Sequence, residues 1–249
     1  MRLHDGVHLI GGGNLGFGLS HPCDGHMYAV ASEGEVALID VGTGLDIAAV
    51  ERELADDGLD PGAIRQLIVT HYHGDHAGGL ARWRARLGGD LPTLAGEDGA
   101  DAIEAGDEDT TGLAAGRRAG IYPDDYHPGP TPITVRLADG DAIPVGRLRI
   151  VAVATPGHCR GHMSFLLAKP DRAFLFSGDA VFWGGTVALQ NVPDCSVPDS
   201  AASLERLAAL EFDALLPGHL TISLTNGKRH VNVAAGHFRA LRIPPPLVP

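Results

Sequence analysis

The chain has 249 residues, a formal net charge of −12 and three cysteines without a Cys-x-x-Cys pair. It is long enough to bury a sizeable core, and its acidity argues against nucleic acid and anionic membranes as partners. A small-molecule substrate is therefore expected. The sequence has no apolar run of about 20 residues, as a transmembrane helix needs, and its N-terminus lacks a signal-peptide pattern. Together with the cysteine usage, this predicts a cytoplasmic protein.

A glycine-rich segment follows the first predicted strand, at 7–10. Residues 11–16 read Gly-Gly-Gly-Asn-Leu-Gly, which fits the Gly-x-Gly-x-x-Gly spacing of a dinucleotide-binding loop. That fingerprint requires the glycine turn to open a helix, and residues 17–22 cannot sustain one. We therefore interpret the segment as a loop and reject a Rossmann fold.

The next elements lead to a cluster of metal-ligand residues. Strands at 26–31 and 36–40 predict a hairpin, and Asp46 is a plausible N-cap for the helix that follows. A buried apolar strand at 67–69 then runs into Thr-His-Tyr-His-Gly-Asp-His at 70–76. Open α/β sheets place ligand sites at the carboxyl ends of their strands. Neutral imidazoles with a carboxylate suit zinc, and also iron or manganese.

Residues 88–132 form the least regular part of the sequence. The stretch 97–120 is rich in glycine, alanine and acidic residues, and it has room for two short helices. An extended loop with Tyr122, Tyr126 and His127 follows. Two interpretations stay open: these side chains touch substrate, or the segment is a solvated lid or insertion without chemistry.

The second half repeats the pattern of strands that lead to ligand-type residues. The expected strands are 134–137, 148–153, 163–167, 173–176 and 212–216. A helix capped by Asp199 or Ser200 is expected before the last strand. Short turns with glycine or proline then present His158, Asp179 and His219. Glycine tolerates the backbone angles that let a ligand turn sharply off a strand.

These motifs, in this order, resemble the signature of the metallo-β-lactamase superfamily, which includes zinc β-lactamases, glyoxalase II and lactonases. The resemblance covers most of the chain. It implies a single domain over 1–249 with an α/β fold of four layers, the αββα sandwich of two mixed β-sheets flanked by helices. It also implies two divalent metal ions, with Zn²⁺ expected and Fe or Mn as alternatives. The implied ligands are His71, His73 and His158 for one ion, Asp75, His76 and His219 for the other, and Asp179 as the bridge.

The resemblance implies a metal-dependent hydrolase. Two bound metals lower the pKa of water from about 15.7 to near 7, so a metal-bridging hydroxide would cleave a small-molecule ester, lactone, thioester or amide. Asp75 would orient this hydroxide. The alternative is an oxidoreductase of the persulfide dioxygenase type, with the same fold and one non-haem iron. In that case His71, His158 and Asp179 would hold the iron.

Three further side chains are candidates for the substrate pocket. His26 begins the predicted hairpin, in a region that borders the active site in this fold, with ordinary loop polarity as the alternative. Phe182 and Trp183 lie where lactonases of the fold often carry a tyrosine. They have no acidic hydroxyl, so they would form an apolar wall of the pocket or part of the core.

Three other features have supporting or structural interpretations. The resemblance implies that Asp40 braces the backbone near the metal loop, and His162 is expected to support the site or the fold in preference to binding metal. The apolar segment 243–249 packs either on a partner subunit, as in a homodimer, or on its own chain.

Overall fold

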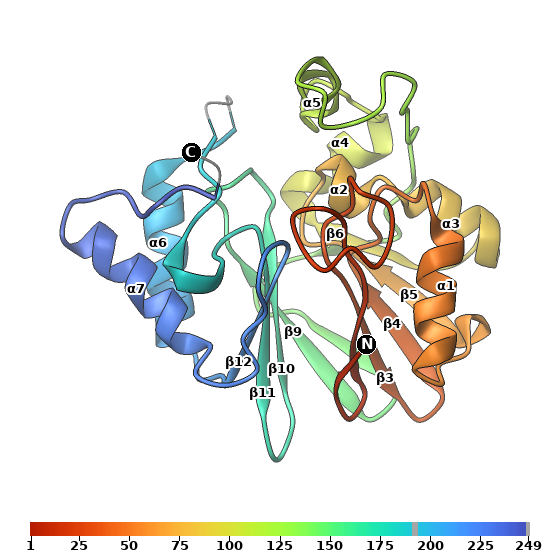
Figure 1. The fold of residues 1–249 in the computed structure, drawn as a ribbon, viewed down its shortest axis with the longest axis horizontal. Coiled ribbons are helices and arrows are strands. Elements are labelled where there is room, and N and C mark those ends of the chain that lie inside the picture. The colour runs from red at the N-terminus through yellow and green to blue at the C-terminus, as the bar shows by residue number, and fades with distance from the viewer. Residues whose placement is uncertain (191–193, 248–249) are drawn as a thin grey trace. The chain divides into compact units, whose positions relative to one another are not determined.

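The computed structural model describes residues 1–190 and 194–247, and the chain divides into two compact units. The first unit comprises 1–137 with 145–147, and the second comprises 138–144 with 148–249. Each unit is built on one β-sheet (Figure 1). That the whole chain forms a single domain stays a prediction.

A seven-stranded mixed sheet forms the core of the first unit, in the order β1-β2-β3-β4-β5-β6-β7. Pairing is antiparallel from β1 to β4 and parallel from β4 to β7. The strands are β1 (Arg2–His4), β2 (Val7–Gly11), β3 (Met27–Ser32), β4 (Glu35–Ile39), β5 (Ile64–Ile68), β6 (Thr93–Gly96) and β7 (Val135–Leu137). Because parallel strands are buried on both faces, β4 is apolar from Val36 to Ile39, and β5 is apolar and buried at Leu67 and Ile68, where it leads into the metal loop.

Helices of the first unit begin where the sequence provides caps or turns. They are α1 (Ile47–Asp56), the 3-10 turn η1 (Pro61–Ala63), α2 (Gly74–Ala77), α3 (Leu80–Leu87), α4 (Glu97–Ala105) and α5 (Leu113–Arg118). The predicted N-cap is correct, since the Asp46 carboxylate accepts a hydrogen bond from the Ala49 amide at 3.0 Å. Trp83 of α3 is fully buried, and its indole N–H donates to the Val41 carbonyl at 3.3 Å.

The second unit has a five-stranded mixed sheet in the order β12-β11-β10-β9-β8. Its strands are β8 (Ala142–Val145), β9 (Leu148–Ala154), β10 (Met163–Ala168), β11 (Ala173–Gly178) and β12 (Ala214–Pro217). Strand β10 pairs antiparallel with β9 and β11, whereas β11 and β12 are parallel. Parallel pairing brings the carboxyl ends of β11 and β12 to the same edge of the sheet.

Two helices cover this second sheet. They are α6 (Val197–Ala209) and α7 (Lys228–Arg239), which pack against each other (Figure 1), and the 3-10 turn η2 (Trp183–Gly185) precedes them. Leu204 and Leu207 of α6 and Val231 of α7 are fully buried in one apolar cluster, together with Leu175 and Leu215 of the sheet. The sheet and both helices therefore share one core.

Several elements differ from the sequence prediction. Strands β1, β6 and β8 and helix α7 were not predicted, so the strand expected to be the first is β2. The predicted cap of α6 was wrong: the Ser196 hydroxyl, not Asp199 or Ser200, caps this helix by accepting from the Asp199 amide at 3.3 Å. Pro198 explains the earlier start, because proline suits the first turn of a helix, where its missing N–H has no partner to lose.

The C-terminal segment lies on its own chain as far as the structure describes it. The Val187 N–H donates to the Pro245 carbonyl at 3.0 Å, and the Leu247 N–H donates to the Val187 carbonyl at 2.8 Å. Residues 248 and 249, which belong to the same predicted tail, lie outside the described residues.

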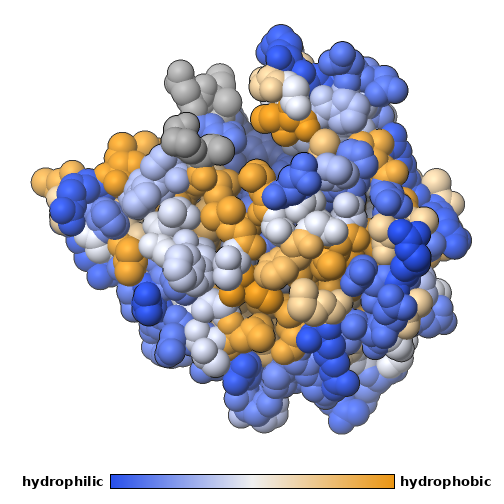
Figure 2. Space-filling model, in the orientation of Figure 1, coloured by the Kyte–Doolittle hydropathy of each residue, from blue (hydrophilic) through white to orange (hydrophobic). Residues whose placement is uncertain are grey.

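The exposed surface contains both hydrophobic and hydrophilic residues. On the face shown in Figure 2, hydrophobic residues lie among hydrophilic ones, as is usual for folded proteins. Among residues 1–190 and 194–247, no helix combines the length and apolar character needed to cross a membrane.

Candidate metal centre

The metal loop, residues 70–76, leaves β5 and enters α2. His71 and His76 are buried, and His73 and Asp75 are half-buried. The Nε2 atom of His71 lies 3.1 Å from Nδ1 of His73, and Nε2 of His76 lies 3.6 Å from Oδ2 of Asp75. Two ligand atoms at about 2.1 Å from one tetrahedral zinc ion stand about 3.4 Å apart. The loop therefore brings four predicted ligands together at distances that suit metal binding.

Asp40, at the end of β4, holds this loop in place. Its Oδ1 accepts a hydrogen bond from the Thr70 amide at 2.7 Å, and its Oδ2 lies 2.8 Å from Nδ1 of His76. The Thr70 hydroxyl bonds to Asp40 and lies 2.9 Å from Nδ1 of His71. Both buried imidazoles thus have Nδ1 engaged and present Nε2 as the ligand atom, as is usual for metal-bound histidine.

Two tyrosines from the segment 88–132 also contact the metal loop. The Tyr122 hydroxyl donates to Oδ1 of Asp75 at 2.8 Å, and the Tyr126 hydroxyl shares its one proton between the carbonyls of Thr43 at 2.9 Å and Gly74 at 3.1 Å. Both side chains are buried. Burial, reinforced by the negative charge of Asp75, raises the pKa of Tyr122 well above its ordinary value. The hydroxyl therefore stays protonated and donates.

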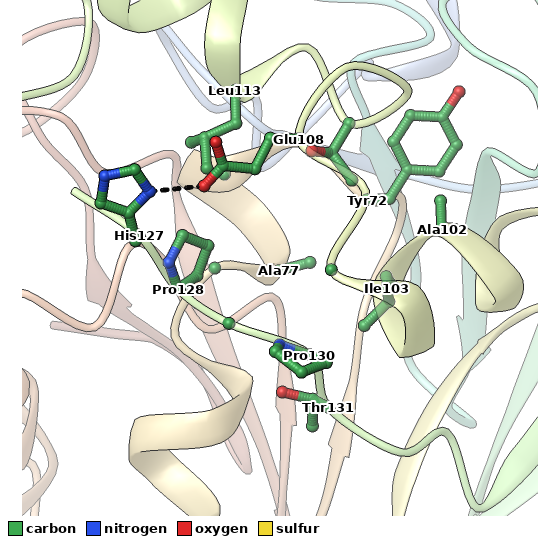
Figure 3. Close-up of a pocket in the computed structure, with 15 residues that line it drawn as sticks. Tyr72, Ala77, Ala102, Ile103, Glu108, Leu113, His127, Pro128, Pro130 and Thr131 are labelled. Carbon is green, nitrogen blue, oxygen red and sulfur yellow. Dashed lines mark hydrogen bonds and ion pairs between the residues drawn. The ribbon is translucent and has the colours of Figure 1, made fainter. Parts of the chain in front are cut away.

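A pocket of about 270 Å³ lies between α2 and the segment 88–132 (Figure 3). Its walls are mostly apolar and include Ala77 and Ile103. His127 lies at the wall with Nδ1 2.6 Å from the Glu108 carboxylate. Hydrogen bonds from Arg117 and then His127 lower the pKa of Glu108. Of the three residues left open as substrate contacts or lid, only His127 is solvent-exposed; Tyr122 and Tyr126 are buried.

The second unit brings together His158, Asp179 and His219. All three side chains are buried. Oδ2 of Asp179 lies 3.7 Å from Nε2 of His158 and 3.5 Å from Nε2 of His219. One carboxylate oxygen therefore faces two imidazoles. This arrangement suits a carboxylate that belongs to two groups of metal ligands, one with His158 and one with His219.

Backbone groups support these residues. Nδ1 of His158 donates to the Ala188 carbonyl at 2.8 Å, which directs Nε2 toward Asp179. The Asp179 amide donates to Nε2 of His162 at 3.0 Å, and Nδ1 of His162 bonds to the Thr155 hydroxyl at 2.8 Å. His162 thus holds the backbone of Asp179.

The three substrate-pocket candidates have different surroundings. The His26 ring is fully buried within the first unit, with the Phe17 ring 5.4 Å away between centroids. Phe182 is fully buried in the second unit, and its ring centroid lies 6.1 Å from that of His219. Trp183 is 49% exposed and packs on His230. A pocket role for the three stays a prediction.

Three supports of the candidate ligands were not predicted: Thr70, Tyr122 and Ala188. The strand pairing could have indicated Thr70. Because β4 and β5 are parallel with Ile39 opposite Ile68, the residues that follow these strands, Asp40 and Thr70, lie at the same edge of the sheet. Tyr122 lies 47 positions from Asp75 and has no comparable local signal.

The sequence matches a family and several curated relatives. Residues 21–219 match the family model described as metallo-β-lactamase superfamily. A hydroxyacylglutathione hydrolase of Cupriavidus taiwanensis is 34% identical over 202 residues, which cover 76% of this chain and 57% of that protein. An acyl-coenzyme A thioesterase of Bos taurus is 30% identical over 196 residues, 72% of this chain and 67% of that protein. The chain spans about half the length of the curated hydroxyacylglutathione hydrolases and hydrolase-like proteins that it matches.

Solved structures share the fold. A subclass B3 metallo-β-lactamase of Bradyrhizobium japonicum has a TM-score of 0.73 at 21% identity, covering 97% of this chain and 91% of that chain. A metallo-β-lactamase family protein of Thermus thermophilus has a TM-score of 0.70 at 25% identity, covering 96% and 81%. These likenesses confirm the predicted αββα fold class. Together with the family match, they show that the chain belongs to the metallo-β-lactamase superfamily.

Proposed function

We propose that the protein is a metal-dependent hydrolase of a small-molecule ester, lactone, thioester or amide. One observation carries the proposal: the buried imidazoles of His71, His76 and His158 each have Nδ1 held by an oxygen atom. Such partners fix the orientation of metal-binding histidines and raise their basicity. Each of the three also has its Nε2 within 3.7 Å of another predicted ligand atom.

The proposed ligands are five histidines and two aspartates that hold two divalent ions. Imidazole and carboxylate suit zinc, with iron and manganese as alternatives. The matched region, 21–219, includes all of them: His71, His73, Asp75, His76, His158, Asp179 and His219. When bound, such ions activate water and polarise the scissile carbonyl.

Asp75 has the main role in proton transfer in this proposal. A carboxylate within hydrogen-bond reach of an attacking water orients it and accepts its proton. The same proton then passes to the leaving thiolate, alkoxide or amine. Tyr122 holds Oδ1 of Asp75, and the apolar ring of Phe182 lies beside His219, with 6.1 Å between ring centroids.

Thioesters are the substrates to test first. The two relatives described above are named for hydroxyacylglutathione and acyl-coenzyme A, and both of these compounds are thioesters. The net charge of −12 also supports a small molecule over nucleic acid.

Metal analysis and hydrolysis assays on the purified protein test the proposal. We expect close to two zinc ions per chain and release of thiol from a hydroxyacylglutathione or acyl-coenzyme A thioester. A chelator should abolish the activity and added Zn²⁺ should restore it. One iron per chain, with oxygen uptake on a persulfide, would support the dioxygenase alternative instead. A protein that binds neither zinc nor iron would overturn the proposal.

A further inference from the structure

The Tyr122 hydroxyl contacts Asp75 twice. It donates to Oδ1 of the carboxylate at 2.8 Å and accepts from the backbone N–H of the same residue at 3.2 Å. A phenolic hydroxyl has one proton to donate and lone pairs to accept, so both contacts are made at once. One side chain thus fixes both the backbone and the carboxylate of Asp75.

The two carboxylate oxygens of Asp75 have different surroundings. Oδ1 accepts from Tyr122, whereas Oδ2 lies 3.6 Å from Nε2 of His76. The Asp75 carbonyl accepts from the Gly25 amide at 3.0 Å, which fixes the peptide on its other side. Tilting the carboxylate plane would break the bond to Tyr122, so this bond fixes the plane and leaves the other oxygen facing His76.

We propose that Tyr122 is the positioning residue that directs Oδ2 of Asp75, together with Nε2 of His76, toward one metal ion. This inference rests on the proposed metal-dependent function. It assigns to the segment 88–132 the task of orienting a ligand in the metal loop.

The ring of Tyr122 is itself closely packed. It is 8% exposed and forms an apolar cluster with Leu113 and Tyr126. A Cβ atom added at Gly116 would lie 2.6 Å from two carbon atoms of the Tyr122 ring, far inside contact distance. Glycine at 116 therefore lets the ring approach α5, and the hydroxyl has little freedom to move.

The helix that carries Asp75 depends on such external bonds. Helix α2 has four residues and begins with Gly74, and Gly78 follows it directly. Glycine disfavours helix by about 1 kcal/mol relative to alanine. The pocket in Figure 3 borders Ala77 and Gly78, so open space lies against part of this helix. The Tyr122 hydroxyl, bonded to both the amide and the carboxylate of Asp75, provides a fixed point that the helix lacks on its own at this residue.

Tyr122→Phe is the main test, because it removes the hydroxyl and keeps the ring. Loss of a partner that orients a ligand typically weakens metal binding by about 10–100-fold. We expect this loss for one of the two ions only, measured by calorimetric titration of the metal-free protein with Zn²⁺. The visible spectrum of the Co²⁺-loaded variant should change for the same ion, and kcat should fall while KM changes little.

Tyr126→Phe is the matched control. It also removes one buried hydroxyl from the same cluster, but that hydroxyl bonds to the carbonyls of Thr43 and Gly74 and not to Asp75. We expect a lower thermal unfolding midpoint with the two Zn²⁺ affinities affected alike. If Tyr126→Phe weakened one ion as selectively as Tyr122→Phe, the effect would be one of packing and the inference would be wrong.

Gly116→Ala provides a second variant in case Tyr122→Phe does not fold. It keeps the Tyr122 hydroxyl but displaces the ring, so it should produce the same selective loss of one ion. A folded Tyr122→Phe or Gly116→Ala protein with the parent's two affinities would overturn the inference alone. A parent protein without bound metal or hydrolysis would overturn the proposed function instead.

Discussion

In the first unit, supporting side chains bond directly to the side chains of two predicted ligands, whereas in the second unit a backbone carbonyl holds His158 and Asp179 is held through its backbone amide. Asp40 and Tyr122 bond to ligand residues of the metal loop through their own side chains. In the second unit a carbonyl holds His158, and the amide of Asp179 is the group held by His162. A side-chain support is lost by one substitution, but a carbonyl remains whichever residue carries it. Sensitivity to mutation outside the ligand set should therefore be greater in the first unit.

The topology explains this difference. The first unit places its four predicted ligands within six residues of one loop, so their supports come from another strand end and from the segment 88–132. In the second unit His158, Asp179 and His219 follow three different strands of one sheet. The sheet ladder already fixes those strand ends, and fewer side chains are needed to hold them.

We expect the largest effect on activity and metal content from substitution of a proposed ligand, in either unit. His73→Ala in the first unit and Asp179→Asn in the second should each abolish hydrolysis and lower the metal content per chain, because each removes a proposed ligand. Elemental analysis and a thioester assay measure both. Wild-type activity in either variant would contradict the assignment of two ions.

Asp40→Ala should have the largest effect among the supporting residues. It leaves the Thr70 amide, the Thr70 hydroxyl and Nδ1 of His76 without their acceptor in a buried site. Each unmet buried group costs about 1–3 kcal/mol, so we expect the free energy of unfolding to fall by about 3 kcal/mol or more. Urea unfolding of the metal-free protein gives the measurement.

Asp60→Ala is the matched control for this substitution. Asp60 also accepts a backbone hydrogen bond, from Gly62 at 2.8 Å, but on the surface. Loss of such a cap costs about 1 kcal/mol. Equal destabilisation by Asp40→Ala and Asp60→Ala would show that the metal loop does not depend on Asp40.

His162→Ala should have a smaller effect. It leaves the buried Asp179 amide without its acceptor, which costs about 1–3 kcal/mol, and metal binding should weaken with it. Ala188→Ser keeps the carbonyl that holds His158, so its metal affinity should match that of the parent. Calorimetric titration with Zn²⁺ compares the two variants, and equal losses would remove the distinction between side-chain and backbone supports.

The smallest expected effect is the contribution of His230 to the pH dependence of folding stability. Burial, and then the charge of Arg229, lower the pKa of His230 below its usual 6.5, and its Nδ1 accepts from the Gly184 amide at 2.9 Å. The folded state therefore favours the neutral ring. The resulting stability is complete above about pH 6.5 and is lost as the pH falls through the lower folded value.

His230→Gln should remove this part of the pH dependence. The measurement is the difference in urea midpoint between pH 7.5 and pH 5.5 for the parent and the variant. The parent should lose more stability at the lower pH. An identical loss in both proteins would mean that His230 does not contribute.

The strands that carry the motifs were predictable because each is an apolar run ended by glycine, proline or a polar ligand. Strand β6 was missed, since its four residues are defined by parallel pairing with β5 and β7 and not by a local pattern. Helix α7 was missed for a related reason. It contains histidine, asparagine, valine and glycine, which are poor helix formers, and burial of Val231, Ala234 and Ala235 stabilises it.

The candidate site was predictable only in part. The types and spacing of the ligand residues could be predicted from the sequence, and so could the strand that ends at Asp40. The bond from Tyr122 to Asp75 was not, because 47 residues separate the two and the intervening segment has no regular periodicity. Contacts of this kind follow from tertiary packing.

The backbone of Asp40 has a consequence for protein engineering. Its φ is +60°, in the left-handed region that favours glycine. A search for stabilising substitutions by local conformation alone would select Asp40→Gly, yet that change would remove the carboxylate that holds the metal loop. Asn226 and Leu241, with φ of +57° and +54°, lie on the surface, and glycine relieves more strain at Leu241 because asparagine tolerates this conformation better than leucine does. A thermostability library should therefore vary these two positions and keep Asp40 fixed.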